Sequence, residues 1–186
     1  MPASPDSSPA LVLNADFRPL SYFPLSLWPW QEAVKAVFLD RVNIVSEYDR
    51  VVHSPSFAMR LPSVIALRIY QDLERPAPLR RINLYILYGG RCAYCGKAAP
   101  TEEMTFDHIV PRARGGLSSY RNLALACLPC NLRKGCRTPG EAGMRPWQEP
   151  RHPTLAELNR RARGMRLTHL SRTALDNLYW RTFLEP

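Results

Sequence analysis

Two pairs of cysteines with the spacing Cys-x-x-Cys constrain this chain more than any other feature. The pairs are Cys92/Cys95 and Cys127/Cys130, and the 31 residues from 96 to 126 separate them. In a reducing compartment such pairs usually bind zinc, and four thiolates can close a tetrahedron around one Zn²⁺. Two disulfides or a thioredoxin-type redox pair are the alternatives. The fifth cysteine, Cys136, stands outside the pattern. We therefore predict one structural zinc site.

The segment between and after the cysteine pairs has the pattern of two strands, a loop and a helix. We expect strands at 104–111 and 123–127, a loop at 112–122 and a helix at 128–135 that ends at a glycine. A zinc ion with four cysteine ligands has no open position for a substrate. Any chemistry must therefore come from polar side chains within this segment. The candidates are Asp107, His108, Asn122 and Asn131.

These polar side chains are of kinds that hold a cation and move a proton. The carboxylate of Asp107 is a hard oxygen donor for Mg²⁺ or a similar ion, and Asn131 offers an amide oxygen from the first turn of the expected helix. Histidine has a reference pKa near 6.5, which suits His108 to the role of general base near neutral pH.

The runs "DHIVPRARGG" (107–116) and "RNLALACLPCNLRKG" (121–135) resemble the HNH endonuclease family in its zinc-knuckle-bearing form. The shared elements are Asp-His-Ile/Val-x-Pro, Gly-Gly, Asn-Leu and Cys-x-x-Cys-Asn-x-x-Lys-Gly, in that order. The resemblance covers about residues 80–137. It implies an α+β protein whose ββα-metal (HNH) core, at 79–137, is fastened by the four-cysteine zinc site.

The resemblance also implies an activity, which is metal-dependent hydrolysis of DNA phosphodiester bonds that leaves 5′-phosphate and 3′-hydroxyl ends. His108 then takes the place of the family's first histidine and acts as general base, and Asn122 is expected to pin the loop or orient His108. Asn131 stands where the family's name has a second histidine, and with Asp107 it would hold the catalytic cation. An amide at this position favours Mg²⁺ or Mn²⁺ over Zn²⁺.

Positive charge is concentrated around the motif. The net charge is +9, and residues 80–145 carry eleven lysines and arginines against four acidic residues, whereas residues 1–79 carry seven against eight. Such an excess favours a polyanionic partner, here DNA, although a solvated basic surface would have the same composition. The candidates for contacts with DNA phosphates are Arg112, Arg114, Arg133 and Lys134.

The outer parts of the chain show no catalytic pattern. Residues 1–10 have neither the basic start nor the apolar segment of a signal peptide, so we expect a disordered lead and a cytoplasmic protein. Residues 11–75 have the pattern of a small α/β module, and their "LNADFRPLS" start is similar to that of bacterial HNH proteins. This module is expected to contain a short strand from residue 11, a helix at 30–40 and strands at 42–48 and 63–70.

Behind this module we expect a linker at 75–78 and a helix at 79–90 that leads into the first cysteine pair. Residues 138–186 are expected to form a linker followed by C-terminal helices at 154–164 and 171–186.

Two other functions compete with that of a nuclease. A zinc-stabilised module that binds nucleic acid without catalysis would share the cysteines and the charge, but it would not require Asp107, His108 and Asn131. A zinc deaminase also uses Cys-x-x-Cys, but it needs a His-x-Glu motif that this sequence lacks. The sequence leaves open the DNA target, the choice between nicking and double-strand cleavage, the biological pathway, the role of the N-terminal module and the oligomeric state.

Overall fold

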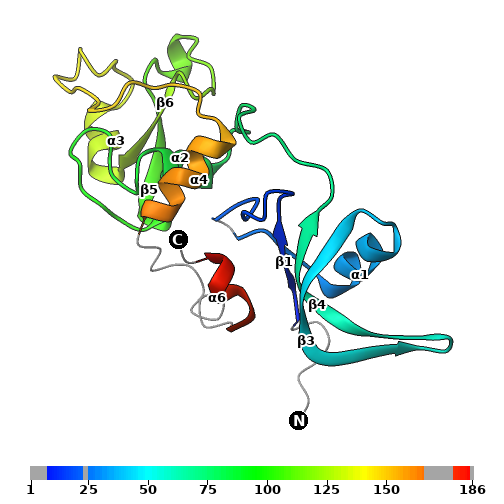
Figure 1. The fold of residues 1–186 in the computed structure, drawn as a ribbon. Coiled ribbons are helices and arrows are strands. Elements are labelled where there is room, and N and C mark those ends of the chain that lie inside the picture. Colours follow the sequence, from blue (N-terminus) through cyan, green and yellow to red (C-terminus); the bar gives the residue numbers. More distant parts are fainter. Residues whose placement is uncertain (1–7, 23–24, 166–177, 185–186) are drawn as a thin grey trace. The chain divides into compact units, whose positions relative to one another are not determined.

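The computed structural model describes residues 8–22, 25–165 and 178–184 of the 186-residue chain. Its contacts divide the chain into two compact units. The first unit contains the described residues up to 72 together with those from 178 onward, and the second unit begins at residue 73 and runs to 165. Figure 1 shows that each unit combines strands with helices, which confirms the expected α+β class.

The first unit is built on a sheet of four strands, β1 (Ala10–Leu13), β2 (Leu27–Trp28), β3 (Val42–Ser54) and β4 (Phe57–Leu67). Their order in the sheet is β2-β1-β4-β3. β1 pairs in parallel with β4 and antiparallel with β2, while β3 and β4 form a long antiparallel hairpin. Of the expected disordered lead, residues 1–7 lie outside the described residues, whereas Ala10 is buried in β1.

The hairpin differs from the expected strands at 42–48 and 63–70. The segment "SPSFAMRLP" (54–62), which contains two prolines and lies between the expected strands, closes the hairpin and forms the first half of β4. Pro62 lies within β4 opposite Glu47. The register shifts between Ile44 and Val51 are the kind of irregularity that admits a proline, because a bulge removes the demand for a ladder hydrogen bond.

One face of the sheet is covered by helix α1 (Trp30–Phe38), in place of the expected helix at 30–40. Ala33 and Ala36 of this helix pack with Val12, Val42 and Ile65. The small alanine side chains let the helix approach the sheet closely, and Pro29 precedes it at the position where a proline is well tolerated.

The opposite face of the same sheet is covered by helix α6 (Leu178–Leu184). Its Trp180 packs with alternate residues of β1 and β4, among them Leu11 and Val64, and its indole Nε1 donates to the carbonyl of Ser63 at 2.8 Å. The sequence interpretation grouped residues 138–186 together, but these contacts assign α6 to the N-terminal unit. The other part of the expected helix, residues 171–177, lies outside the described residues.

The second unit contains the ββα element. Strands β5 (Met104–His108) and β6 (Leu123–Cys127) pair antiparallel, with Met104 opposite Cys127 and His108 opposite Leu123, and helix α3 (Leu128–Lys134) begins directly after β6. The expected strand at 104–111 therefore ends three residues early, because pairing stops at His108. A turn of 3₁₀ helix (Arg112–Arg114) follows, and Gly115 ends it with a positive φ of 81°.

Two further helices complete the second unit. Helix α2 (Arg81–Leu87), in place of the expected helix at 79–90, is followed by Gly89 and Gly90, whose positive φ angles turn the chain into the first cysteine pair. Helix α4 (Leu155–Gly164) begins at Thr154, whose hydroxyl accepts the backbone N–H of Glu157. The expected linker at 75–78 is not free, because Ala77 donates to the carbonyl of Pro153 at 2.9 Å. None of the described helices combines the length and hydropathy that crossing a bilayer requires.

Candidate active site and metal centre

The four predicted zinc ligands come together in the second unit. The sulfur atoms of Cys92, Cys95, Cys127 and Cys130 all lie within 4.8 Å of one another. The Sγ atoms of Cys95 and Cys127 are 3.7 Å apart, close to the ~3.8 Å edge of a tetrahedron with Zn–S bonds of about 2.3 Å. The cluster therefore fits a structural metal such as zinc, whereas Cys136 is exposed and does not belong to it.

The first cysteine pair is tied to the strands and to a later segment of the chain. The backbone N–H of Ala93 donates to the carbonyl of Leu125 in β6 at 2.7 Å. Trp147 forms two hydrogen bonds here, from its indole to the carbonyl of Cys92 and from its backbone N–H to the carbonyl of Ala93, both at 3.0 Å. The loop that carries Cys92 is thus fixed from both sides.

Asp107 lies in β5 with its side chain only 3 % exposed, and both of its carboxylate oxygens have hydrogen-bond partners. Oδ1 accepts from the ammonium group of Lys134 at 2.8 Å, and Oδ2 accepts from the hydroxyl of Tyr94. The same Lys134 ammonium donates to the carbonyl oxygen of His108 at 2.7 Å. One buried cation therefore contacts two successive residues of the predicted site.

Two tyrosines define the electrostatics around Asp107. Burial raises the pKa of the Tyr94 hydroxyl far above its ordinary value, and the hydrogen bond to Asp107 raises it further. Burial also raises the pKa of Tyr88 to about 12, with a smaller contribution from the negative charge of Asp107. The Tyr88 hydroxyl is buried without a hydrogen-bond partner in the described part of the chain. Both hydroxyls remain protonated at neutral pH, so Tyr94 is the donor to Asp107.

Asn131, in the first half of α3, faces β5. Its amide Nδ2 donates to Thr105 Oγ1 at 2.8 Å and approaches the carbonyl of Phe106 at 3.5 Å. Because the Thr105 hydroxyl already donates to the carbonyl of Ala126 at 2.9 Å, it can only accept from Asn131. This network fixes the orientation of the amide group and turns its Oδ1 oxygen away from Thr105. That oxygen is available as a ligand for a hard cation.

His108, the last residue of β5, is half-buried. Its Nε2 lies 2.9 Å from the hydroxyl oxygen of Ser118 in the following loop. With Ser118 as acceptor, Nε2 carries the proton and Nδ1 keeps a lone pair with which it can accept one. The ring is therefore oriented by a neighbour that the sequence pattern did not identify.

Asn122 holds the loop between β5 and β6. Its Oδ1 accepts from the backbone N–H of Val110 at 2.8 Å, and its Nδ2 donates to the carbonyls of Val110 and Leu117 at 3.1 and 3.0 Å. Gly116 lies against the same place, because a Cβ there would come within 1.8 Å of the Val110 carbonyl oxygen. All these contacts are to the loop, and Leu117 is next to Ser118, the partner of His108.

The four predicted phosphate contacts have different environments. Arg112 and Arg133 are exposed, whereas Arg114 forms an ion pair with Glu141 at 2.8 Å. The expectation for Lys134 was wrong, because its side chain is only 1 % exposed and lies against Asp107. A buried lysine ammonium needs a charged partner, and Asp107 provides it from β5.

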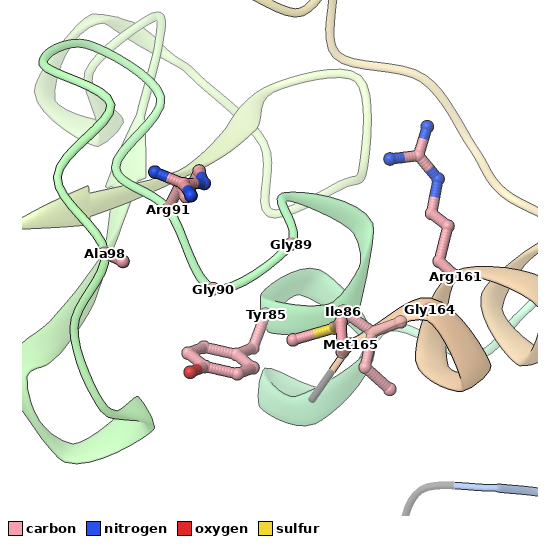
Figure 2. A pocket seen from close by; sticks show the side chains of 9 residues that line it. All are labelled: Tyr85, Ile86, Gly89, Gly90, Arg91, Ala98, Arg161, Gly164 and Met165. Carbon is pink, nitrogen blue, oxygen red and sulfur yellow. The ribbon is translucent and has the colours of Figure 1, made fainter. Parts of the chain in front are cut away.

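A surface pocket of about 490 Å³ lies elsewhere in the second unit, where the end of α2 meets α4. In Figure 2, Tyr85 and Ile86 project from α2, while Arg161 projects from α4 with its guanidinium group turned away from the tyrosine ring. Neither Asp107, His108 nor the two asparagines line this pocket. It is therefore separate from the candidate active site.

Three residues at the candidate site were not found in the sequence, namely Tyr94, Thr105 and Ser118. Each contacts a residue from another part of the motif, as Tyr94 does Asp107 thirteen positions away. The location of Tyr94 between two cysteines was the only signal, because the zinc pattern predicted that this loop is fastened to the helix that follows the two strands.

Comparison with known proteins agrees with this geometry. Residues 92–146 match the family model of HNH endonucleases, and residues 10–75 match that of the HNH endonuclease-associated N-terminal domain. The CRISPR-associated endonuclease Cas9 of Corynebacterium diphtheriae is 38% identical over 65 residues, which are 34% of this chain and 5% of that relative. The chain therefore spans only a small fraction of the relative's length. The two family matches, over residues 10–75 and 92–146, confirm the resemblance to the HNH endonuclease family that the sequence showed.

Proposed function

We propose that this protein is a DNA endonuclease that hydrolyses phosphodiester bonds with the help of a divalent cation. The observation that carries the proposal is the convergence of three groups on one ββα element. His108 has its ring oriented by Ser118, the Asp107 carboxylate is fixed beside it, and Asn131 has its amide oxygen turned away from Thr105. The family match and the endonuclease name of the Cas9 relative support the same activity.

The candidate ligands for the catalytic cation are the carboxylate of Asp107 and the amide oxygen of Asn131. Both are hard oxygen donors, which suits Mg²⁺ or Mn²⁺ rather than a tightly held transition metal. The two oxygens of Asp107 each accept one hydrogen bond and keep further lone pairs. When bound, such a cation polarises the phosphate and stabilises the negative charge on the leaving oxygen.

His108 supplies the proton acceptor. Its Nδ1 takes a proton from a water molecule as the water oxygen attacks phosphorus, and the bond between phosphorus and the 3′ oxygen breaks. The leaving 3′ oxygen takes a proton from solvent water, so the products carry a 5′-phosphate and a 3′-hydroxyl. With Ser118 as the acceptor, the proton stays on Nε2 and the ring keeps one orientation, while Asn122 holds the loop that carries Ser118.

The four-cysteine cluster has a structural role, and zinc is the metal that its ligands suit. Four thiolates leave no position for water or substrate, so zinc here joins the first cysteine loop to the start of α3 without entering the reaction. DNA is the partner that the charge distribution favours, with the exposed Arg112 and Arg133 as contacts for its phosphates.

One observation favours a second candidate, a zinc-stabilised module that binds nucleic acid without cutting it. The ammonium group of Lys134 already neutralises Asp107, which is the role that a cation would otherwise fill. Incubation of the purified protein with plasmid DNA, with and without Mg²⁺ or Mn²⁺, separates the two candidates. The nuclease converts supercoiled plasmid to nicked or linear forms only with the cation, and sequencing of the ends finds 5′-phosphates. DNA binding with no cleavage under either cation, on plain or modified DNA, supports the second candidate.

A further inference from the structure

The carboxylate of Asp107 is held by two segments that both begin at the cysteine cluster. Tyr94, which donates to Oδ2, lies between the two cysteines of the first pair. Lys134, which donates to Oδ1, is the last residue of α3, the helix that begins at the second pair. A metal bound by all four cysteines would therefore join the two segments whose side chains fix Asp107.

We propose that Tyr94 is a positioning residue that presents Asp107 to the catalytic cation, and that the cysteine cluster contributes to this site through Tyr94. The inference rests on the proposed role of Asp107 as a ligand. A carboxylate oxygen that accepts a hydrogen bond from a fixed hydroxyl is restricted in rotation before the cation arrives. Partners of this kind behind a metal ligand typically change metal affinity by 10- to 100-fold when they are removed.

The surroundings make this hydroxyl a fixed one. The backbone N–H of Tyr94 points at the sulfur of Cys92 at 3.5 Å, and the preceding residue, Ala93, is hydrogen bonded to β6. Trp147 closes the loop from the other side through the carbonyl of Cys92. The backbone on which Tyr94 stands is therefore held from both sides, and the hydroxyl lies beside Asp107.

The chain offers a matched control. Tyr120 is a buried tyrosine of the second unit, 3 % exposed, whereas Tyr94 is half-buried, and the Tyr120 hydroxyl donates to the carbonyl of Pro78 at 2.9 Å. Tyr120→Phe and Tyr94→Phe delete the same atom and the hydrogen bonding that it provides, but only the second change removes a contact with Asp107. General loosening of the unit affects both variants, whereas loss of positioning affects only Tyr94→Phe.

The test is the binding of Mn²⁺ to the full-length, zinc-loaded protein without DNA, followed by the electron paramagnetic resonance of free Mn²⁺. Binding at the candidate site is the part of the Mn²⁺ binding that Asp107→Ala weakens. We expect Tyr94→Phe to weaken this binding at least about 10-fold while zinc content stays at the wild-type level and Tyr120→Phe binds Mn²⁺ normally. In cleavage assays, Tyr94→Phe should raise the Mn²⁺ concentration needed for half-maximal rate more than it lowers the rate at saturation.

Three results would overturn the proposal, namely wild-type Mn²⁺ affinity in Tyr94→Phe, equal weakening in both tyrosine variants, or loss of zinc from Tyr94→Phe. The last would mean that Tyr94 stabilises the cysteine cluster and does not position Asp107.

The binding test does not depend on nuclease activity. If the wild type binds Mn²⁺ through Asp107 and Tyr94→Phe weakens it, the inference stands even where no DNA is cut. If the wild type cuts DNA and Tyr94→Phe binds Mn²⁺ normally, only the inference fails. If the wild type has no Asp107-dependent binding, both fail.

Discussion

The ammonium group of Lys134 lies 2.8 Å from Oδ1 of Asp107, and both side chains are almost completely excluded from solvent. In a buried ion pair each charge depends on its partner, because either charge alone would be costly to bury. The pair also joins the end of α3 to β5, and through the carbonyl of His108 it reaches the residue proposed as general base. This ion pair therefore contributes to stability and also fixes residues of the proposed active site.

Removal of the lysine charge should destabilise the protein strongly. Lys134→Met keeps most of the volume but leaves Asp107 buried without its cation, and breaking such a pair typically costs about 3–5 kcal/mol of unfolding free energy. Denaturant unfolding of the zinc-loaded protein measures the loss. Arg133→Met, one position earlier and exposed, is the control and should change stability by less than about 0.5 kcal/mol. Equal stability of the two variants would mean that Lys134 is not buried against Asp107.

The cysteine cluster should bind about one zinc ion per chain. Cys92→Ser, Cys95→Ser, Cys127→Ser and Cys130→Ser should each lower the zinc content and the melting temperature, because metal binding contributes directly to the free energy of folding. Elemental analysis and thermal unfolding are the measurements. Cys136→Ser is the matched control, since its thiol is exposed and outside the cluster, and it should resemble the wild type. Freshly purified wild type without zinc would refute the assignment.

DNA binding should depend steeply on salt, and single residues should contribute to the slope. Each phosphate contact adds about 0.9 to the slope of log affinity against log salt concentration, so Arg112→Ala and Arg133→Ala should each reduce it by about one. Titrations of labelled duplex between about 50 and 200 mM salt measure this. Arg114→Ala should have a smaller effect, because Glu141 already pairs with its guanidinium group. An affinity that does not change with salt would contradict a DNA partner bound through phosphates.

Ser118 should matter for the reaction and not for the fold. Ser118→Ala removes the partner of His108 Nε2, and we expect a rate about 10-fold lower, a part of the ~10²- to 10⁴-fold that a general base contributes. Ser118→Thr keeps the hydroxyl and should restore most of the rate. Single-turnover cleavage measures this, with zinc content and DNA affinity unchanged in both variants. Equal rates for the alanine and threonine variants would show that the Ser118 hydroxyl does not orient His108 for the reaction.

The ββα element could be predicted from the sequence because its signals are local. The strands, the glycines of the loop and the start of α3 lie within about thirty residues, and the cysteine spacing limits how they can be joined. The four-cysteine cluster could be predicted too, because the spacing within each cysteine pair is itself a local signal. Asn122 was predictable as the residue that pins the loop, because its partners Val110 and Leu117 lie close to it in the sequence.

The errors arose where a partner lies far away in the chain. Lysine is rarely buried, so Lys134 was placed on the surface, and only Asp107, 27 residues earlier, makes its burial possible. Trp180 packs against strands more than a hundred positions away, so the sequence of α6 did not indicate that this helix belongs to the first unit. In β4, Pro62 interrupted the strand pattern, and bulges in the opposing strand that accommodate it have no clear sequence signal.

The central claim is that His108 is the proton acceptor and that Asp107 and Asn131 hold the cation. The most direct measurement is the single-turnover cleavage rate of His108→Ala, Asp107→Ala and Asn131→Ala as Mg²⁺ or Mn²⁺ is raised. His108→Ala should lose at least ~10²-fold at every metal concentration while it keeps zinc and DNA binding, because no cation replaces a proton acceptor. The other two should recover part of their rate at high metal, because mass action can fill a weakened site. Cleavage by His108→Ala at the wild-type rate would contradict the account.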